Sequence, residues 1–148
     1  MMVSIKGQKG SVALFTVVIL MTIGLLLIKS LHFFQERAHD ELQKEIKYFE
    51  AFNKAESALA WGLTLQWDIN TNNFRHWSCQ QEATEKWESC LKHDKGKNFV
   101  LSGKSPFRNG KDIKVYQWVI FDFERKQFFP RKNGWLDYCP VVKKGFCE

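Results

Sequence analysis

Residues 9–28 read KGSVALFTVVILMTIGLLLI, and this stretch decides how the chain is organised. Its residues from Ser11 to Ile28 carry no charge. A helix of that length spans about 27 Å, close to the thickness of the hydrocarbon core of a bilayer. The hydroxyl groups of Thr16 and Thr22 can bond to a carbonyl one turn earlier, so they do not prevent insertion. The stretch therefore predicts a helix at residues 11–29 that crosses a membrane once.

The flanking charges predict how this helix is oriented. The segment from Met1 to Gly10 is short, polar and basic, with Lys6 and Lys9 and no acid, whereas residues 30–59 mix both signs. Because basic residues stay on the cytoplasmic side, the N-terminus is expected in the cytoplasm and the rest of the chain outside.

Three interpretations of this junction compete. A secretory signal has a shorter apolar core followed by a small-residue cleavage site, which the sequence around Lys29 lacks. A plain single-pass anchor would keep the whole N-terminus. In the third interpretation, cleavage after Gly10 removes a leader, residues 1–10, and leaves the apolar helix in the mature protein.

A second helical segment, residues 30–66, follows directly. No Pro precedes Pro106, and the only glycines between Ser11 and Leu65 are Gly24 and Gly62, which favours one continuous helix. After Lys29 the apolar residues become periodic and form one stripe: Leu31, Phe34, Ala38, Leu42, Ile46, Phe49, Phe52, Leu59 and Leu63. The stripe has two interpretations. Either two helices pair through it as a coiled coil, or its later half docks on the protein's own head while its earlier half contacts other subunits.

Residues 67–148 are expected to form a small head outside the membrane. It holds all four cysteines, Cys79, Cys90, Cys139 and Cys147, and an even number in an exported domain indicates two disulfides. Three pairings are possible; we favour Cys79–Cys90 and Cys139–Cys147 because each closes a short loop. A metal site is disfavoured because there is no Cys-x-x-Cys motif.

The local patterns of the head predict an α+β fold in which the long helix packs on a small antiparallel sheet. The strongest strand signal is the alternation at Ile113–Glu124, which Gln117 interrupts. The other expected elements are a helix stop at Asp68–Asn73, a short helix at Glu82–Leu91, a strand at Asn98–Ser102, a turn at Pro106–Lys111, a return strand at Gln127–Phe129 stopped by Pro130, and a loop from Asn133 to Glu148.

Composition points away from catalysis. We find no phosphate-binding glycine loop, nucleophile elbow or zinc-protease helix motif, so we expect no enzyme activity and no cofactor. The formal charge of +6 is spread over many lysines, a pattern typical of solubility, with weak DNA binding as a lesser candidate. The six tryptophans are expected mainly in the core, and some could belong to a partner surface.

Lys9-Gly10, the apolar run and the amphipathic helix together resemble type IV prepilins and type II secretion pseudopilins. The resemblance implies that a prepilin peptidase cuts the Gly10–Ser11 bond and methylates the new N-terminus at Ser11. Two positions depart from the common pattern: Ser11 stands where major pilins have Phe, and Phe15 stands where most pilins have Glu. In that family, a subunit without this Glu is a minor one placed at the filament tip.

Two further segments extend the resemblance. Residues 55–59, Ala-Glu-Ser-Ala-Leu, are similar to an element of PilX-like minor pilins. Residues 57–62, with Pro130-Arg131, Gly134-Trp135, Asp137, Cys139-Pro140 and a last cysteine near the C-terminus, resemble the YgdB family of minor pilin-like proteins.

The resemblance implies a minor subunit that primes or caps a type IV pilus or a related secretion or competence filament. Its partners would be other minor pilins or pseudopilins, the major pilin, the prepilin peptidase and inner-membrane lipid, with a weak DNA or surface ligand as a further candidate. The head would be periplasmic before assembly and lie at the filament tip afterwards. The alternative is a bitopic inner-membrane envelope protein whose coiled-coil stem acts as an interaction module.

Overall fold

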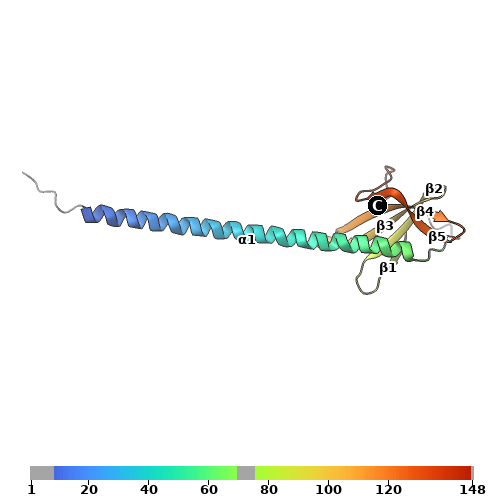
Figure 1. Cartoon of the computed structure of the whole chain (residues 1–148), viewed down its shortest axis with the longest axis horizontal. Coiled ribbons are helices and arrows are strands. Elements are labelled where there is room, and N and C mark those ends of the chain that lie inside the picture. The colour runs from blue at the N-terminus through green and yellow to red at the C-terminus, as the bar shows by residue number, and fades with distance from the viewer. Residues whose placement is uncertain (1–8, 70–75, 148) are drawn as a thin grey trace, which may run out of the picture. The chain divides into compact units, whose positions relative to one another are not determined.

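The computed structural model describes residues 9–69 and 76–147, which form one long helix followed by a sheet (Figure 1). The helix, α1, spans Lys9–Thr64. Five strands form an antiparallel sheet in the order β1-β2-β3-β4-β5. The strands are β1 (Ser78–Gln81), β2 (Glu88–Lys95), β3 (Asn98–Pro106), β4 (Asp112–Asp122) and β5 (Gln127–Leu136), and a short 3₁₀ turn, η2, spans Arg108–Gly110. The predicted α+β fold is confirmed.

The prediction of a single continuous helix is confirmed, because α1 runs without a break from Lys9 to Thr64. The chain forms two compact units, an N-terminal unit that ends at Glu45 and a head unit that begins at Ile46, so α1 contributes residues to both. The helix ends at Thr64, before the predicted stop at Asp68–Asn73, which from residue 70 lies outside the described residues. At this end, the indole Nε1 of Trp67 donates a hydrogen bond to the carbonyl of Gly62 at 2.9 Å. The bond satisfies one of the carbonyls that a helix C-terminus leaves without a partner.

Within the head, residues 46–64 of α1 cover one face of the sheet. Ala55 and Leu59 of the helix are buried against alternate residues of the strands, and Phe52 and Leu63 pack beside them. The strand residues of this core are Leu91, Phe99, Leu101, Val115, Val119, Phe121 and Phe128. The later half of the predicted apolar stripe therefore docks on the protein's own head.

Small residues set how closely the helix approaches the sheet. A Cβ atom added to Gly103 of β3 would lie 2.0 Å from the carbonyl oxygen of Ala55 and 2.7 Å from the amide nitrogen of Leu59. The facing helix residues are themselves small, with Ala51, Ala55 and Ala58 buried. The predicted stripe has no large apolar residue between Phe52 and Leu59, and this contact explains why: a large side chain at Ala55 has no room.

The other face of the sheet is covered by the C-terminal loop. Phe146 of the loop is buried against Val100 and Tyr116, with Trp77 and Trp118 at the margin. None of the six tryptophans is fully buried, and Trp135 is 43% exposed. Trp67 packs at the margin of the core under α1, as Trp77 and Trp118 do at the other core, so the tryptophans do not fill the cores as expected.

The predicted short helix at Glu82–Leu91 is wrong. Its first residues form a turn in which the carboxylate of Glu82 accepts hydrogen bonds from the amides of Thr84 and Glu85, at 2.8 and 2.5 Å. Its last residues belong to β2, which pairs with both β1 and β3. Pairing on both sides and a disulfide to β1 override the helix preference of a Glu- and Lys-rich segment.

The predicted end of the last strand at Pro130 is also wrong, because β5 continues to Leu136. Pro130 is tolerated because β5 is an edge strand, where a missing amide donor interrupts no second ladder. The register with β4 shifts between Gln117 and Val119. Gln117 is buried there, and its side-chain amide donates to the carbonyl of Arg131 at 3.1 Å, which explains why a polar residue interrupts the β4 alternation.

Candidate functional site

The first half of α1 carries an exposed apolar surface. From Gly10 onward the helix is long and apolar enough to cross a membrane once, and none of its most apolar window is buried in the protein. The hydroxyl of Thr16 donates to the carbonyl of Ala13, and that of Thr22 to Ile19, each at 2.8 Å. Both polar groups are therefore satisfied within the helix, as an apolar surrounding requires.

Gly10 and Ser11 lie in the first turns of α1, and both are exposed. A Cβ atom added to Gly10 would meet no atom within 4 Å, apart from its own helix backbone and chain neighbours. The packing of the described chain therefore does not require glycine at this position. Residues 1–8 of the predicted leader lie outside the described residues. Phe15, 69% exposed, presents its ring on the apolar surface.

The middle of α1 presents the remainder of the predicted stripe. In the N-terminal unit, Leu31, Phe34 and Leu42 are all more than half exposed. In the head unit, Phe49 is 60% exposed, whereas Phe52, less than one turn later, packs on the sheet. The stripe thus has two parts. The part from Phe52 onward packs on the sheet, and the part from Leu31 to Phe49 remains exposed in the described chain.

The two disulfides have the pairing favoured from the sequence. Cys79–Cys90 joins directly opposite residues of β1 and β2, and Cys139–Cys147 closes the C-terminal loop. Cys79 and Cys90, with Glu88, form the one group within the described ranges whose atoms lie close enough for a shared metal ion. Two of its three ligands are disulfide sulfurs rather than the thiolates that bind metals, so the oxidised group is a poor metal site.

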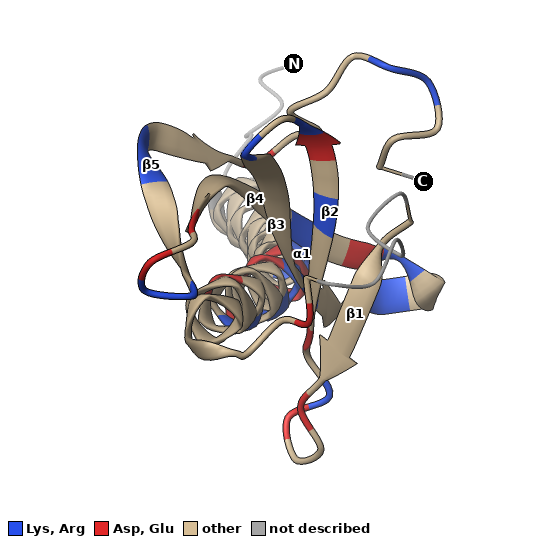
Figure 2. Ribbon diagram, turned by 90° about the vertical axis from the view of Figure 1, so that its right-hand side faces the viewer, with Lys and Arg blue, Asp and Glu red and all other residues tan. Residues whose placement is uncertain are grey.

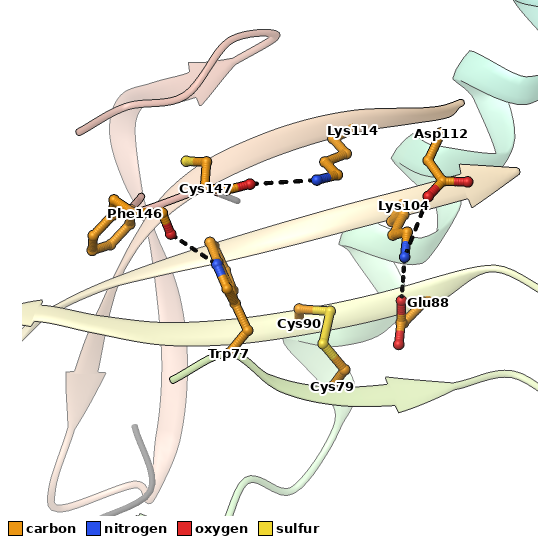
Figure 3. The surroundings of a disulfide bond; sticks show 9 residues. All are labelled: Trp77, Cys79, Glu88, Cys90, Lys104, Asp112, Lys114, Phe146 and Cys147. Atoms are coloured by element: carbon orange, nitrogen blue, oxygen red, sulfur yellow. Dashed lines mark hydrogen bonds and ion pairs between the residues drawn. A yellow bond between two sulfur atoms is a disulfide. The ribbon is translucent and has the colours of Figure 1, made fainter. Parts of the chain in front are cut away.

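A pocket of about 170 Å³ lies beside the β1–β2 disulfide, between the sheet and the C-terminal loop (Figure 3). At one end, the ammonium of Lys104 contacts the carboxylates of Glu88 at 3.1 Å and Asp112 at 3.3 Å. The hydrogen bond to Glu88 is the main cause that raises the pKa of Lys104, against the opposing effect of burial. At the other end, the Nε1 of Trp77 donates to the carbonyl of Phe146 at 2.9 Å. Lys104 is thus compensated by acids, whereas Lys114, also in the lining, donates to the carbonyl of Cys147 at 3.4 Å and forms none of the ion pairs between described residues.

Sequence reasoning missed this convergence of Glu88, Lys104 and Asp112. The only signal was the Asn109-Gly110 turn, which fixes the β3–β4 register and brings Asp112 opposite Pro106, beside Lys104. Glu88 could not be assigned to this cluster from the sequence because its strand was predicted as a helix.

The hydroxyls of Ser57 and Thr64, like those of Thr16 and Thr22, donate to backbone carbonyls of α1, which is a structural use of these groups.

A family model described as "Protein of unknown function (DUF2509)" matches residues 19–147 of the chain. The match begins within the apolar helix and covers the stem, the sheet and the disulfide-closed loop. No curated protein and no solved structure matches the sequence significantly.

Proposed function

The chain belongs to the DUF2509 family of unknown function, and we propose that it is a minor pilin-like subunit that primes or caps a filament of the type IV pilus or type II secretion class. In this proposal the leader is cut at Gly10–Ser11 and Ser11 is methylated. The subunit enters the inner membrane with its head in the periplasm and then joins other minor subunits at the filament tip.

The observation that carries the proposal is the position of Gly10, which has no packing role in the described chain and stands directly before the charge-free run of α1. An added Cβ at Gly10 would meet no described atom within 4 Å, apart from its chain neighbours and its own helix backbone, so packing does not account for the glycine. In this proposal, recognition by a peptidase is the reason for a glycine at this position. The resemblance of residues 9–28 to prepilins supplies that reason.

The distribution of exposed apolar residues supports an assembly role. Side chains on α1 remain exposed from the membrane segment through Phe34 to Phe49. Large exposed apolar surfaces commonly mark interaction sites, and a bundle of sister helices would cover both the membrane part and the stem.

Phe15 supports a place at the tip rather than in the shaft. A carboxylate at this position would be costly in a bilayer unless another subunit supplied a partner charge. A subunit with Phe15 needs no such partner, which suits the first subunit to leave the membrane.

The test is N-terminal mass spectrometry of the native protein, with Gly10→Val and Gly24→Val as matched variants. Both glycines lie in α1 with no atom within 4 Å of an added Cβ, so neither change meets another part of the described chain. We expect wild type and Gly24→Val to begin at methylated Ser11, and Gly10→Val to keep its leader. A Gly10→Val product shortened by ten residues contradicts the proposal.

The second candidate, a bitopic envelope protein with a coiled-coil stem, is favoured by the same exposed residues Leu31, Phe34 and Leu42, which could pair between two copies. It predicts that the native wild-type protein begins at Met1 or Met2. Mass spectrometry of wild type therefore separates the two candidates.

A further inference from the structure

A cleft of about 530 Å³ lies between β2 and the C-terminal loop, apart from the disulfide pocket. Six lining residues are lysines or histidines: His76, Lys92, His93, Lys95, Lys143 and Lys144. The ring of His93 is already engaged, because its Nε2 lies 2.7 Å from the carbonyl oxygen of Gly96 and the ring packs on Phe99. One carboxylate, Asp94, faces it. The sequence shows these lysines as scattered charges, and the fold gathers them because the loop closed by Cys139–Cys147 returns to β2 (Figure 2).

The lysines of this cleft are not compensated by acids. None of the ion pairs formed between described residues includes Lys92, Lys95, Lys143 or Lys144. Elsewhere in the head, Lys54 and Lys104 each contact two carboxylates. With the histidines neutral, the cleft carries a local charge of +3, from four lysines and Asp94.

Lys92 is held in position by several contacts at the floor of the cleft. Its ammonium donates to the carbonyl of Phe146 at 2.7 Å and lies 4.3 Å from the ring centroid of that residue. It also lies 5.4 Å from the ring centroid of Trp77. Burial, and secondarily the charge of Lys143, lower its pKa. An anion in the cleft would relieve this repulsion between ammonium groups.

Two further pairs of a cation and an aromatic ring lie outside the cleft, near the turns that join β2 to β3 and β4 to β5. Lys97, two residues beyond Lys95, lies over the ring of Phe123 at 5.6 Å, and Arg125 lies over Phe129 at 5.7 Å. Phe123 is 62% exposed. Exposed aromatic rings near basic side chains can stack on nucleic-acid bases, so this end of the sheet could add contacts to a longer ligand held in the cleft.

We propose that the cleft between β2 and the C-terminal loop binds phosphate groups, supplied either by a small organic phosphate or by the phosphodiester backbone of a single-stranded nucleic acid. Several lysine point charges favour a multivalent anion over a single carboxylate. The volume of the cleft exceeds one phosphate and falls within the range of small-ligand sites. The site is independent of the filament role proposed above.

Binding is tested on the full chain in a zwitterionic detergent, with pyrophosphate and a fluorescein-labelled oligothymidylate as probes. The cleft variant is Lys143→Gln/Lys144→Gln, and the control, Lys111→Gln/Lys132→Gln, removes the same charge from exposed lysines outside the cleft. We expect the cleft variant to weaken binding by about tenfold or more and the control by less than about twofold. For the oligonucleotide, the slope of log affinity against log salt should fall by about 1.4 in the cleft variant only.

The source of the phosphate follows from the two probes. Pyrophosphate binding that depends on the cleft supports a small organic phosphate, and binding of the oligonucleotide alone supports a nucleic acid. The proposal is overturned if neither probe binds, if both double variants lose affinity equally, or if polygalacturonate binds as tightly as the phosphate probes with the same dependence on the cleft. Lys95→Gln, at a separate exposed position of the cleft, repeats the test if the double variant does not fold.

Discussion

Gly103 and Gly62 mark the two places where α1 approaches the sheet most closely, and an added methyl group would meet different atoms at each. At Gly103 the nearest atoms are helix backbone, the carbonyl oxygen of Ala55 and the amide nitrogen of Leu59. At Gly62 the nearest atom is the hydroxyl oxygen of Ser89, 2.0 Å away. A hydroxyl can rotate, whereas a helix backbone moves only if the whole element shifts.

We therefore expect Gly103→Ala to destabilise the head by about 3 kcal/mol or more, and Gly62→Ala by about 1–2 kcal/mol. Chemical unfolding of the full chain in detergent, followed by tryptophan fluorescence, measures both. Ser89→Gly should recover part of the loss when combined with Gly62→Ala and should not rescue Gly103→Ala. Equal losses at the two glycines, or rescue of both by Ser89→Gly, would contradict the packing described.

At the scale of elements, the C-terminal loop and the β1–β2 pair are closed by disulfides that stabilise different kinds of structure. β1 and β2 also share a hydrogen-bonded ladder, whereas residues 137–147 contain no regular element and rely on Cys139–Cys147 and on contacts of Phe146. A loop of this length, once cross-linked, gains about 2–3 kcal/mol on a chain-entropy basis.

Replacing both cysteines of the loop, as Cys139→Ser/Cys147→Ser, should free the segment around Lys143 and Lys144 from the sheet. Trypsin should then cut after these lysines at least about tenfold faster, since local opening has lost about 2 kcal/mol of protection. Cys79→Ser/Cys90→Ser serves as the matched control and should leave the rate at Lys143 and Lys144 within about twofold of wild type. An equal rise in both variants would mean that the loop does not depend on its own disulfide.

Sequence patterns predicted the elements that have strong local signals. α1, β4 and the Asn109-Gly110 turn follow from periodicity, alternation and turn chemistry, and short loops indicated the disulfide pairing. β2 and the second half of β5 could not be predicted, because they depend on neighbouring strands and on an edge position. The basic cleft was hidden for a related reason: its lysines are about fifty residues apart in sequence and meet only after the loop closes.

At the scale of the whole molecule, α1 belongs to two environments. From Gly10 it presents an apolar surface that suits a membrane, and from Ala51 to Leu63 it forms one side of the head core. Between them, exposed residues such as Phe49 are available to other chains. This division predicts that substitutions in α1 can change the stability of the head and the association with other chains separately.

Phe49→Ser should leave the stability of the head within about 0.5 kcal/mol of wild type, because the side chain is 60% exposed. Phe52→Ala should lower it by about 2–3 kcal/mol, because Phe52 packs on the core and lies against Tyr48 and Trp135. Chemical cross-linking in native membranes should show fewer partner adducts for Phe49→Ser. Unchanged cross-linking together with an unfolded head would contradict the division of α1.

The two outer strands of the sheet also limit how copies of the head can meet. An unpaired strand edge is a template for extension by a neighbouring chain, and such extension leads to aggregation. Here one edge, β1, is only four residues long, and the other, β5, lacks an amide at Pro130 and departs from regular register beside it. Neither edge is therefore a good template for joining one head to another sheet to sheet, and the filament role proposed above calls on α1 rather than on the sheet for contacts between subunits.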